Sequence, residues 1–295
     1  MKHPFDKKRL LFLRRIKDAV RGWTRNPNVR RIQMTIACRD CDGIPKAPNA
    51  GRVIQGPQSE RVQVMHEGTL VVAGGYHGKW MSKIIRNLQG HHEPQEELIF
   101  HHVLKSCTQG SLMIEIGAFW AYYTAWWLGA IKNSRALCVE PDDNNRAIGE
   151  KNLALNGRSA TWISSLVGAR QVDSMEFQRE SDGAVAALPC HHIDSLLDTL
   201  GRPAVEMLHI DCQGAELGFL STIRRAVDEK LLRFVFVSTH HESISLSRTT
   251  HGDCLRLLID AGAIILAEHT VDESFSGDGL IVASFRRGDA DLRLP

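Results

Sequence analysis

The chain has 295 residues, of which 43% are hydrophobic and 24% charged, values typical of a soluble globular protein with one large domain. It contains no run of about 18 apolar residues, so the sequence predicts no transmembrane helix, and its first residues lack the apolar segment of a secretory leader. Its seven cysteines, an odd number, argue against a disulfide framework, so we expect a cytoplasmic protein.

The first 31 residues form a basic arm. They hold eleven Lys and Arg against two Asp, a net charge of +9, which leaves −7 for the rest of a chain whose total is +2. Leu13, Ile16, Val20 and Trp23 recur at helical spacing, so the arm is either a solvated, partly helical tail or an amphipathic helix that contacts an anionic membrane or a partner. Nucleic acid is not expected, because no recognisable binding motif accompanies the charge.

Three regions follow one another along the chain. We predict a basic arm and linker over residues 1–50, a cap or lid over residues 51–105, and the cofactor-binding domain over residues 106–295. Short β-like runs occur in the second region, at residues 61–65 and 69–73.

From residue 106 onward, short apolar runs alternate with amphipathic segments, a pattern typical of βαβ units and a parallel sheet. We expect strands at residues 111–116, 135–140, 160–164, 205–210, 233–238, 263–268 and 279–284, and helices over residues 143–156, 215–230 and 253–261. A polar, glycine-containing segment separates the last two strands, which should pair as an antiparallel hairpin. The predicted fold class is α/β: a Rossmann-like class I methyltransferase fold with a seven-stranded, mostly parallel sheet and an N-terminal helical and β extension.

Two residues at the carboxyl ends of the first two strands point to an adenosine-containing cofactor. Gly117 allows a tight turn close to a ligand, and Glu140 suits the two ribose hydroxyls. The loop GAFWAYY has one glycine among bulky aromatics, a poor cradle for pyrophosphate, so S-adenosylmethionine is favoured over NAD. The candidate cofactor-binding residues are Glu115, Gly117, Ala118, Phe119, Thr124, Glu140, Pro141 and Ser164.

Four segments, MIEIGAFWAYYTAWW, CVEPDDNN, HHIDSLL and MLHIDCQGAELGFL, occur in the order and spacing of FkbM-type methyltransferases. Over roughly residues 90–285 the chain resembles this family. The resemblance implies S-adenosylmethionine-dependent O-methylation of a small-molecule or glycan acceptor, typically a sugar or polyketide hydroxyl. The chain departs from the family pattern at four positions. In the first motif, Phe119 replaces the usual Asn and Ala121 the usual second Gly. In the later motif, His209 replaces the usual Lys and Gln213 the usual first Glu.

Candidate catalytic residues follow the fourth and fifth strands at the same sheet edge. These are Asp211, His240 and His241. A histidine can remove the hydroxyl proton near neutral pH, so activity should fall below a pH near ~6.5. Alternatively, Asp211, Glu216 and His240 are ligands of a divalent cation that acidifies the hydroxyl.

A histidine-rich segment precedes the first strand of the domain and is expected to cover the cofactor as a lid or substrate wall. His92 and Glu93 are its candidate substrate-binding residues. Its histidines show no diagnostic metal-binding spacing. Cys38 and Cys41 form a lone CxxC pair, interpreted as free thiols in a turn because zinc would need two further ligands.

Two alternatives remain from the sequence. Because Phe119 and Ala121 depart from the family motif, the chain could instead be a non-catalytic module with the S-adenosylmethionine-binding fold. An NAD-dependent sugar oxidoreductase is the other alternative, and it would bind a nicotinamide cofactor better than S-adenosylmethionine. Measurements of cofactor binding and turnover distinguish these two alternatives from the O-methyltransferase.

Overall fold

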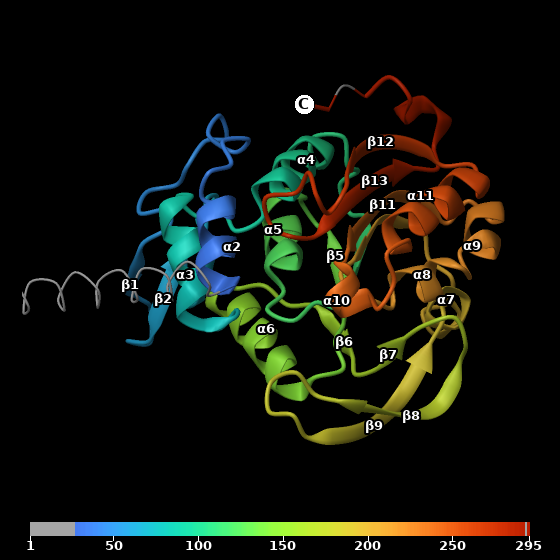
Figure 1. The fold of residues 1–295 in the computed structure, drawn as a ribbon, viewed down its shortest axis with the longest axis horizontal. Coiled ribbons are helices and arrows are strands. Elements are labelled where there is room, and N and C mark those ends of the chain that lie inside the picture. The colour runs from blue at the N-terminus through green and yellow to red at the C-terminus, as the bar shows by residue number, and fades with distance from the viewer. Residues whose placement is uncertain (1–26, 293) are drawn as a thin grey trace, which may run out of the picture.

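A seven-stranded sheet forms the centre of the computed structural model, which describes residues 27–292 and 294–295 (Figure 1). The strands are β4 (Leu112–Ile116), β5 (Arg135–Val139), β6 (Thr161–Ile163), β10 (Val205–Ile210), β11 (Leu232–Thr239), β12 (Ile264–His269) and β13 (Gly279–Ser284). Their order is β12-β13-β11-β10-β4-β5-β6, and β13 runs antiparallel to both β11 and β12, whereas the other neighbours are parallel. The predicted Rossmann-like class I methyltransferase fold, with its final hairpin, is confirmed.

Alternating side chains of the sheet pack against helices on its two faces. Met207 and Phe236 face α4 (Pro94–Leu104) and α5 (Tyr122–Ala130). Leu208 and Val237 lie in the other core cluster, which holds α7 (Ile193–Thr199), α8 (Glu216–Leu220), α9 (Arg224–Asp228) and α11 (Thr250–Asp260). α6 (Asp143–Leu155) lies beside α5 and begins at Asp142, whose carboxylate accepts the backbone N–H groups of Asn144 and Asn145.

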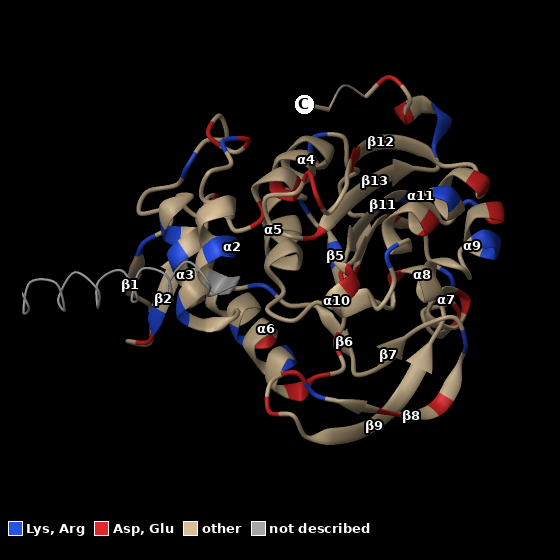
Figure 2. Ribbon diagram, in the orientation of Figure 1, with Lys and Arg blue, Asp and Glu red and all other residues tan. Residues whose placement is uncertain are grey.

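The N-terminal part of the described chain forms a separate small layer beside the large sheet (Figure 1). An antiparallel sheet of β1 (Val53–Gln55), β2 (Arg61–Val64) and β3 (Leu70–Val72) matches the two predicted β-like runs. The helices α2 (Pro27–Thr35) and α3 (Gly78–Asn87) contact each other and carry several Lys and Arg residues (Figure 2). Asn152 of α6 accepts the N–H of Val72 at 2.8 Å, which attaches this layer to the large sheet's helices.

A second small sheet was not predicted. The strands β7 (Leu166–Val167), β8 (Val172–Gln178) and β9 (Val185–His191) form a sheet of order β7-β9-β8, in which β8 and β9 are a hairpin. The sequence prediction left these residues without strands, because most side chains of β8 are exposed and show no clear apolar alternation.

The helix predicted over residues 215–230 is wrong as a single element. It divides into α8 and α9. Between them the hydroxyls of Ser221 and Thr222 donate to the carbonyls of Gly218 and Phe219, at 2.7 and 2.8 Å. Such side-chain bonds compete with the helical backbone pattern, so the helix breaks at this point.

None of the helices in the described part of the chain is long and apolar enough to cross a membrane. The amphipathic stripe predicted for the basic arm, from Leu13 to Trp23, lies outside the described residues. Cys38 and Cys41 are buried free thiols in a turn region after α2.

Candidate active site

A cavity of about 540 Å³ opens at the carboxyl ends of β4, β5, β10 and β11. Its lining includes Glu115, Gly117, Ala118, Phe119, Glu140, Pro141, Asp211 and His240 from the sheet edge, Arg31, Tyr76, His77, His92 and Glu93 from the N-terminal layer, and Phe177, Gln178 and Glu180 from the β8–β9 hairpin. The sequence predictions named most of the sheet-edge residues but none from the hairpin.

The turn after β4 is built around Gly117, with φ of 76°. A Cβ at this position would lie 1.7 Å from the carbonyl oxygen of Asp211, so no side chain fits. Gly117 donates its N–H to Val139 at 2.9 Å, and Asp211 donates its own to Ile116 at 2.9 Å. The turn after β4 and the loop after β10 are therefore in direct backbone contact.

Phe119 and Ala121 have left-handed backbones, with φ of 40° and 53°. Asn and Gly, which the FkbM pattern carries at these positions, adopt that region at low cost, whereas Phe and Ala are strained in it. The ring of Phe119 lines the cavity and packs against Tyr76 and His77, with centroids 5.1 and 5.5 Å apart. Phe119 and Ala121 thus retain the left-handed backbone of the turn, and the ring of Phe119 adds an aromatic surface to the cavity.

Glu140 directly follows β5, and its carboxylate is held by two backbone N–H groups. Oε2 accepts from Phe119 and Oε1 from Asp142, each at 2.9 Å, and the residue is 5% exposed. Burial raises the pKa of Glu140 to about 7, although both hydrogen bonds act in the opposite direction. Each carboxylate oxygen retains a lone pair for a further hydrogen bond, as recognition of two ribose hydroxyls requires.

The remaining predicted cofactor-binding residues divide into two groups. Glu115 and Pro141 line the cavity, whereas Thr124 lies beneath it, where its N–H and hydroxyl both donate to Glu115. Ser164 is turned away and bonds to Arg146 at 2.6 Å. Its neighbour Ser165 lines the cavity instead, with a buried hydroxyl that has no hydrogen-bond partner within the described residues.

Asp211 and His240 lie together on the cavity wall, as their positions at the ends of β10 and β11 predicted. Nε2 of His240 is 3.3 Å from Oδ1 of Asp211, and Nδ1 is 2.6 Å from Oε1 of Glu216, which is fully buried. Burial alone lowers the pKa of His240, but the bond to Glu216 and the charge of Asp211 raise it to about 10. His240 is therefore an imidazolium between the carboxylate of Glu216 and the carboxyl group of Asp211.

The carboxyl group of Asp211 retains 28% of its side-chain exposure and faces the cavity. Burial raises its pKa to about 8, and the nearby carboxylates of Glu93 and Asp278 act in the same direction, whereas His240 opposes them. Asp211 is thus a weakly acidic carboxyl group with access to the cavity.

The predicted cation ligands Asp211, Glu216 and His240 do not converge as a set. His240 directs its two nitrogens at two different carboxylates. Among the described residues, the three His or acidic side chains whose donor atoms approach one another within 4.8 Å are elsewhere in the fold. In this trio one imidazole lies between the two carboxyl groups, so the three side chains do not share a common centre.

His241 does not contribute to the cavity. Its side chain is exposed at the start of α10 (Glu242–Ser245), where Nδ1 accepts the N–H of Ser243 at 3.2 Å. It acts as a helix N-cap, so of the two adjacent histidines His240 is the one that faces the cavity.

His209 is a site residue that the catalytic predictions missed. Its Nε2 lies 2.6 Å from Glu96, which also accepts the hydroxyl of Ser238 at 2.6 Å. Burial lowers the pKa of His209, but Glu96 outweighs it and raises the pKa to about 9. Nδ1 is buried without a partner in the described chain, and the residue lines the cavity. The FkbM pattern has Lys here, so the imidazolium supplies a cation at the lysine position.

The predicted substrate-binding pair lies in the wall opposite the sheet edge. Nε2 of His92 is 3.1 Å from Oε2 of Glu93, which also accepts the hydroxyl of Tyr123 at 3.2 Å. Both residues line the cavity and are largely buried.

The family profile described as the methyltransferase FkbM domain matches residues 111–265. The chain belongs to the FkbM methyltransferase family. The resemblance found in the sequence is confirmed, and the matched residues contain β4 to β11, with the turn at Gly117, Glu140 and the Asp211–His240 pair.

Solved structures similar to this FkbM methyltransferase include three methyltransferases. A precorrin-6y C5,15-methyltransferase from Geobacter metallireducens is 17% identical, with 64% of this chain and 87% of that chain covered and a TM-score of 0.41. A SAM-dependent methyltransferase from Aquifex aeolicus is 10% identical, with 66% of this chain and 94% of that chain covered and a TM-score of 0.39. An O-methyltransferase from Bacillus cereus in complex with SAH is 15% identical, with 65% of this chain and 81% of that chain covered and a TM-score of 0.42. A search of curated proteins finds no significant match. The TM-scores are below 0.5, so the family assignment depends on the profile match.

The cavity of this FkbM methyltransferase fits S-adenosylmethionine, the cofactor predicted from the sequence. Glu140 provides two acceptor oxygens at the end of β5, and the buried hydroxyl of Ser165 lacks a partner in the described chain. Phe119 and Trp120 occupy the loop where a pyrophosphate cradle would need small residues. These features suit an adenosine cofactor without phosphates.

Proposed function

We propose that the chain is an S-adenosylmethionine-dependent O-methyltransferase that acts on a hydroxyl of a sugar, glycan or polyketide-like acceptor. The observation that carries the proposal is the Asp211 carboxyl group, which faces the same cavity as Glu140 and is held by His240. Methylation of a hydroxyl needs a proton acceptor beside the methyl donor.

Residues at the sheet edge would hold the cofactor. Glu140 would accept the ribose hydroxyls and Ser165 would bond to a polar group nearby, while Glu115 lies below the turn. When bound, S-adenosylmethionine supplies an electrophilic methyl group to a nucleophile aligned with its sulfur.

Asp211 is the proposed proton acceptor. Its Oδ atom would take the proton of the acceptor hydroxyl as the oxygen becomes a nucleophile. His240 is less suited to this role, because both of its nitrogens already face carboxylates and its pKa is raised to about 10. It is instead a positioning residue that Glu216 fixes and that in turn orients Asp211.

The region over residues 51–105 is proposed to form the acceptor wall, together with α2. Tyr76 and Trp120 stack in parallel with ring centroids 4.4 Å apart, and Tyr76, Glu93 and Arg31 line the cavity. Aromatic faces beside carboxylate and guanidinium groups suit a ring that carries several hydroxyls.

The test is a transfer assay with isotopically labelled S-adenosylmethionine and panels of sugars, oligosaccharides and polyketides, with peptides and RNA as comparison acceptors. We expect a labelled O-methyl ether from the first three panels. A labelled N-methyl or C-methyl product would contradict O-methylation. Tight cofactor binding without transfer to any acceptor would instead support a non-catalytic module.

A further inference from the structure

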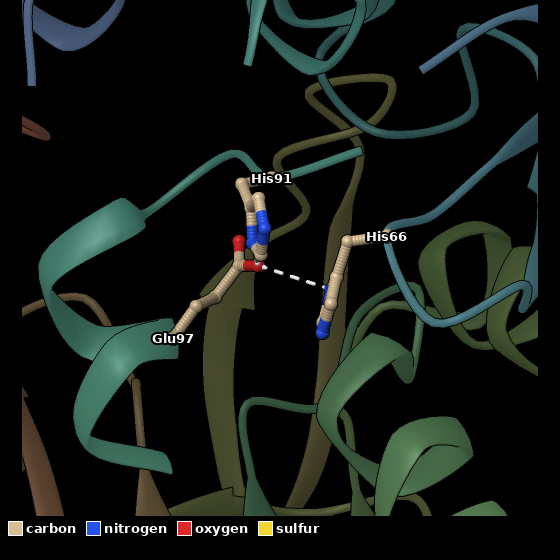
Figure 3. A group of neighbouring side chains, drawn as sticks. All are labelled: His66, His91 and Glu97. Carbon is tan, nitrogen blue, oxygen red and sulfur yellow. Dashed lines mark hydrogen bonds and ion pairs between the residues drawn. The ribbon is translucent and has the colours of Figure 1, made fainter. Parts of the chain in front are cut away.

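A second group of histidine and carboxylate side chains lies outside the cavity, between the N-terminal layer and the methyltransferase domain (Figure 3). His66 belongs to the turn between β2 and β3, His91 follows α3, and Glu97 lies in α4. All three are at most 1% exposed. One donor atom from each lies within 4.8 Å of the other two.

The donor atoms converge on a small volume. Oε2 of Glu97 is 2.5 Å from Nδ1 of His91 and 3.7 Å from Nδ1 of His66, the contact dashed in Figure 3. The hydroxyl of Tyr122 is 2.9 Å from the same nitrogen of His66 and 3.3 Å from the same oxygen of Glu97. Ligands of a tetrahedral zinc ion, bound at about 2.1 Å, are ~3.4 Å apart. The other separations, 2.9 to 3.7 Å, are close to this value, and the short His91–Glu97 hydrogen bond would have to lengthen when an ion binds.

The backbone brings these residues together. Gly90, with φ of 98°, accepts the N–H of His66 at 3.1 Å. A Cβ on Gly90 would lie 2.3 Å from that nitrogen, so glycine is needed for the segment before His91 to approach the β2–β3 turn. The two imidazole rings then stack with centroids 4.1 Å apart.

Polar atoms around this group have no hydrogen-bond partner within the described residues. They are Nε2 of His91 and both carboxylate oxygens of Glu67, one of which is 3.3 Å from Nδ1 of His66. Buried polar atoms without partners are costly, and a bound cation would offset the charge of Glu67 beside it. Imidazole nitrogens with a carboxylate oxygen form a donor set that zinc accepts.

We propose that His66, His91 and Glu97, with the hydroxyl of Tyr122 as the nearest fourth group, bind a structural zinc ion that joins the N-terminal layer to α4 and α5. The ion has no part in methyl transfer. Its effect on the cavity is indirect, because Oε1 of Glu97 accepts the backbone N–H groups of His92 and Glu93 at 2.7 and 3.1 Å. Both of these residues line the cavity, so the ion would fix one of its walls.

The first experiment uses the untagged full chain, purified without chelator, and measures metal by mass spectrometry and stability by thermal unfolding. We expect about one zinc per chain. Removal of the metal with a strong chelator should lower the melting temperature by at least ~5 °C, and zinc should restore it. Metal-free protein whose melting temperature is insensitive to zinc would overturn the proposal without any variant.

Matched variants locate the ion. Glu97→Gln and His91→Ala should each reduce the zinc content at least tenfold and abolish the zinc-dependent melting shift. His102→Ala, on the same helix α4 but outside the group, should retain both. Equal zinc content and an equal shift in Glu97→Gln and His102→Ala would show adventitious binding elsewhere and exclude this site.

Discussion

The two halves of the cavity are built in different ways. At the end of β5, the carboxylate of Glu140 is held by backbone N–H groups, and Gly117 fixes the adjacent turn. Elsewhere around the cavity, carboxyl groups are paired with histidine side chains: Asp211 with His240 at the ends of β10 and β11, and Glu93 with His92 in the opposite wall. The part around Glu140, where we propose that the cofactor binds, is therefore fixed by backbone geometry, whereas the remainder depends on which side chains the fold brings together.

This difference predicts different responses to mutation. A carboxylate held by backbone groups can be removed with a local effect on one ligand contact. When a carboxyl group that is paired with a histidine is removed, the protonation of that histidine changes. Its loss should therefore affect the rate of methyl transfer more than the affinity for the cofactor.

The largest effect is expected for Asp211→Asn. Loss of the proton acceptor should lower turnover by about 10²–10⁴-fold, with cofactor affinity little changed, because Asn retains the size but not the basicity. Single-turnover kinetics with and without EDTA measure this. Asp278→Asn, which removes another cavity carboxylate, is the matched control and should have a much smaller effect. Turnover near that of the wild type in a folded, cofactor-saturated Asp211→Asn enzyme would exclude Asp211 as the base.

Glu140→Ala tests the cofactor half. We expect S-adenosylmethionine binding to weaken by about 1–3 kcal/mol, roughly 5–150-fold in Kd, because the ribose hydroxyls lose a charged acceptor. Titration calorimetry measures the affinity, with Glu180→Ala as a second cavity acid that should leave it largely unchanged. Equal affinities for wild type and Glu140→Ala would contradict the assignment.

The pH dependence of turnover distinguishes Asp211 from a free imidazole as the base. Burial raises the pKa of Asp211 to about 8, and the ionised form is the active one. The single-turnover rate at saturating cofactor should therefore rise with pH through about 8 and then level off, falling about tenfold per pH unit well below it. A plateau that begins near ~6.5, the pKa of an unperturbed histidine, would restore histidine as the base.

The smallest effect is expected at the strained turn. Ala121→Gly should raise the free energy of unfolding by up to ~1 kcal/mol, because the left-handed backbone at φ of 53° is strained for Ala and free for Gly. Denaturant unfolding measures this, and Ala125→Gly in the helical interior of α5 should instead destabilise. Destabilisation by both substitutions would show that the buried methyl group of Ala121 outweighs the strain.

The sequence predicted the sheet and the placement of Glu140 at its edge well, because both are encoded locally. All seven strands lie where apolar runs predicted them, and Glu140 follows from its place after β5. Ser164 does not line the cavity: it follows β6 and bonds to Arg146, and its neighbour Ser165 lines the cavity instead.

The other half was less predictable because its contacts span long sequence separations. The bond of His209 to Glu96 joins residues 113 positions apart, and no local pattern marks it. The β8–β9 hairpin did carry a local signal, since its turn contains Asp182 and Gly183, a dipeptide typical of hairpin turns. The hairpin was still not predicted, because most side chains of β8 are exposed and its sequence lacks the alternation of apolar residues typical of a strand.

The close approach of Gly117 to Asp211 has a consequence for how new specificities could arise in this family. A shift of the Asp211 loop toward a larger acceptor would also displace the turn at Gly117, so under the proposed roles the cofactor and the base would move together. We therefore expect acceptor range to diversify through lining residues away from these two loops, such as Tyr76, His92 and Glu93. Libraries for altered acceptor use should concentrate on those positions and leave the loops after β4 and β10 intact.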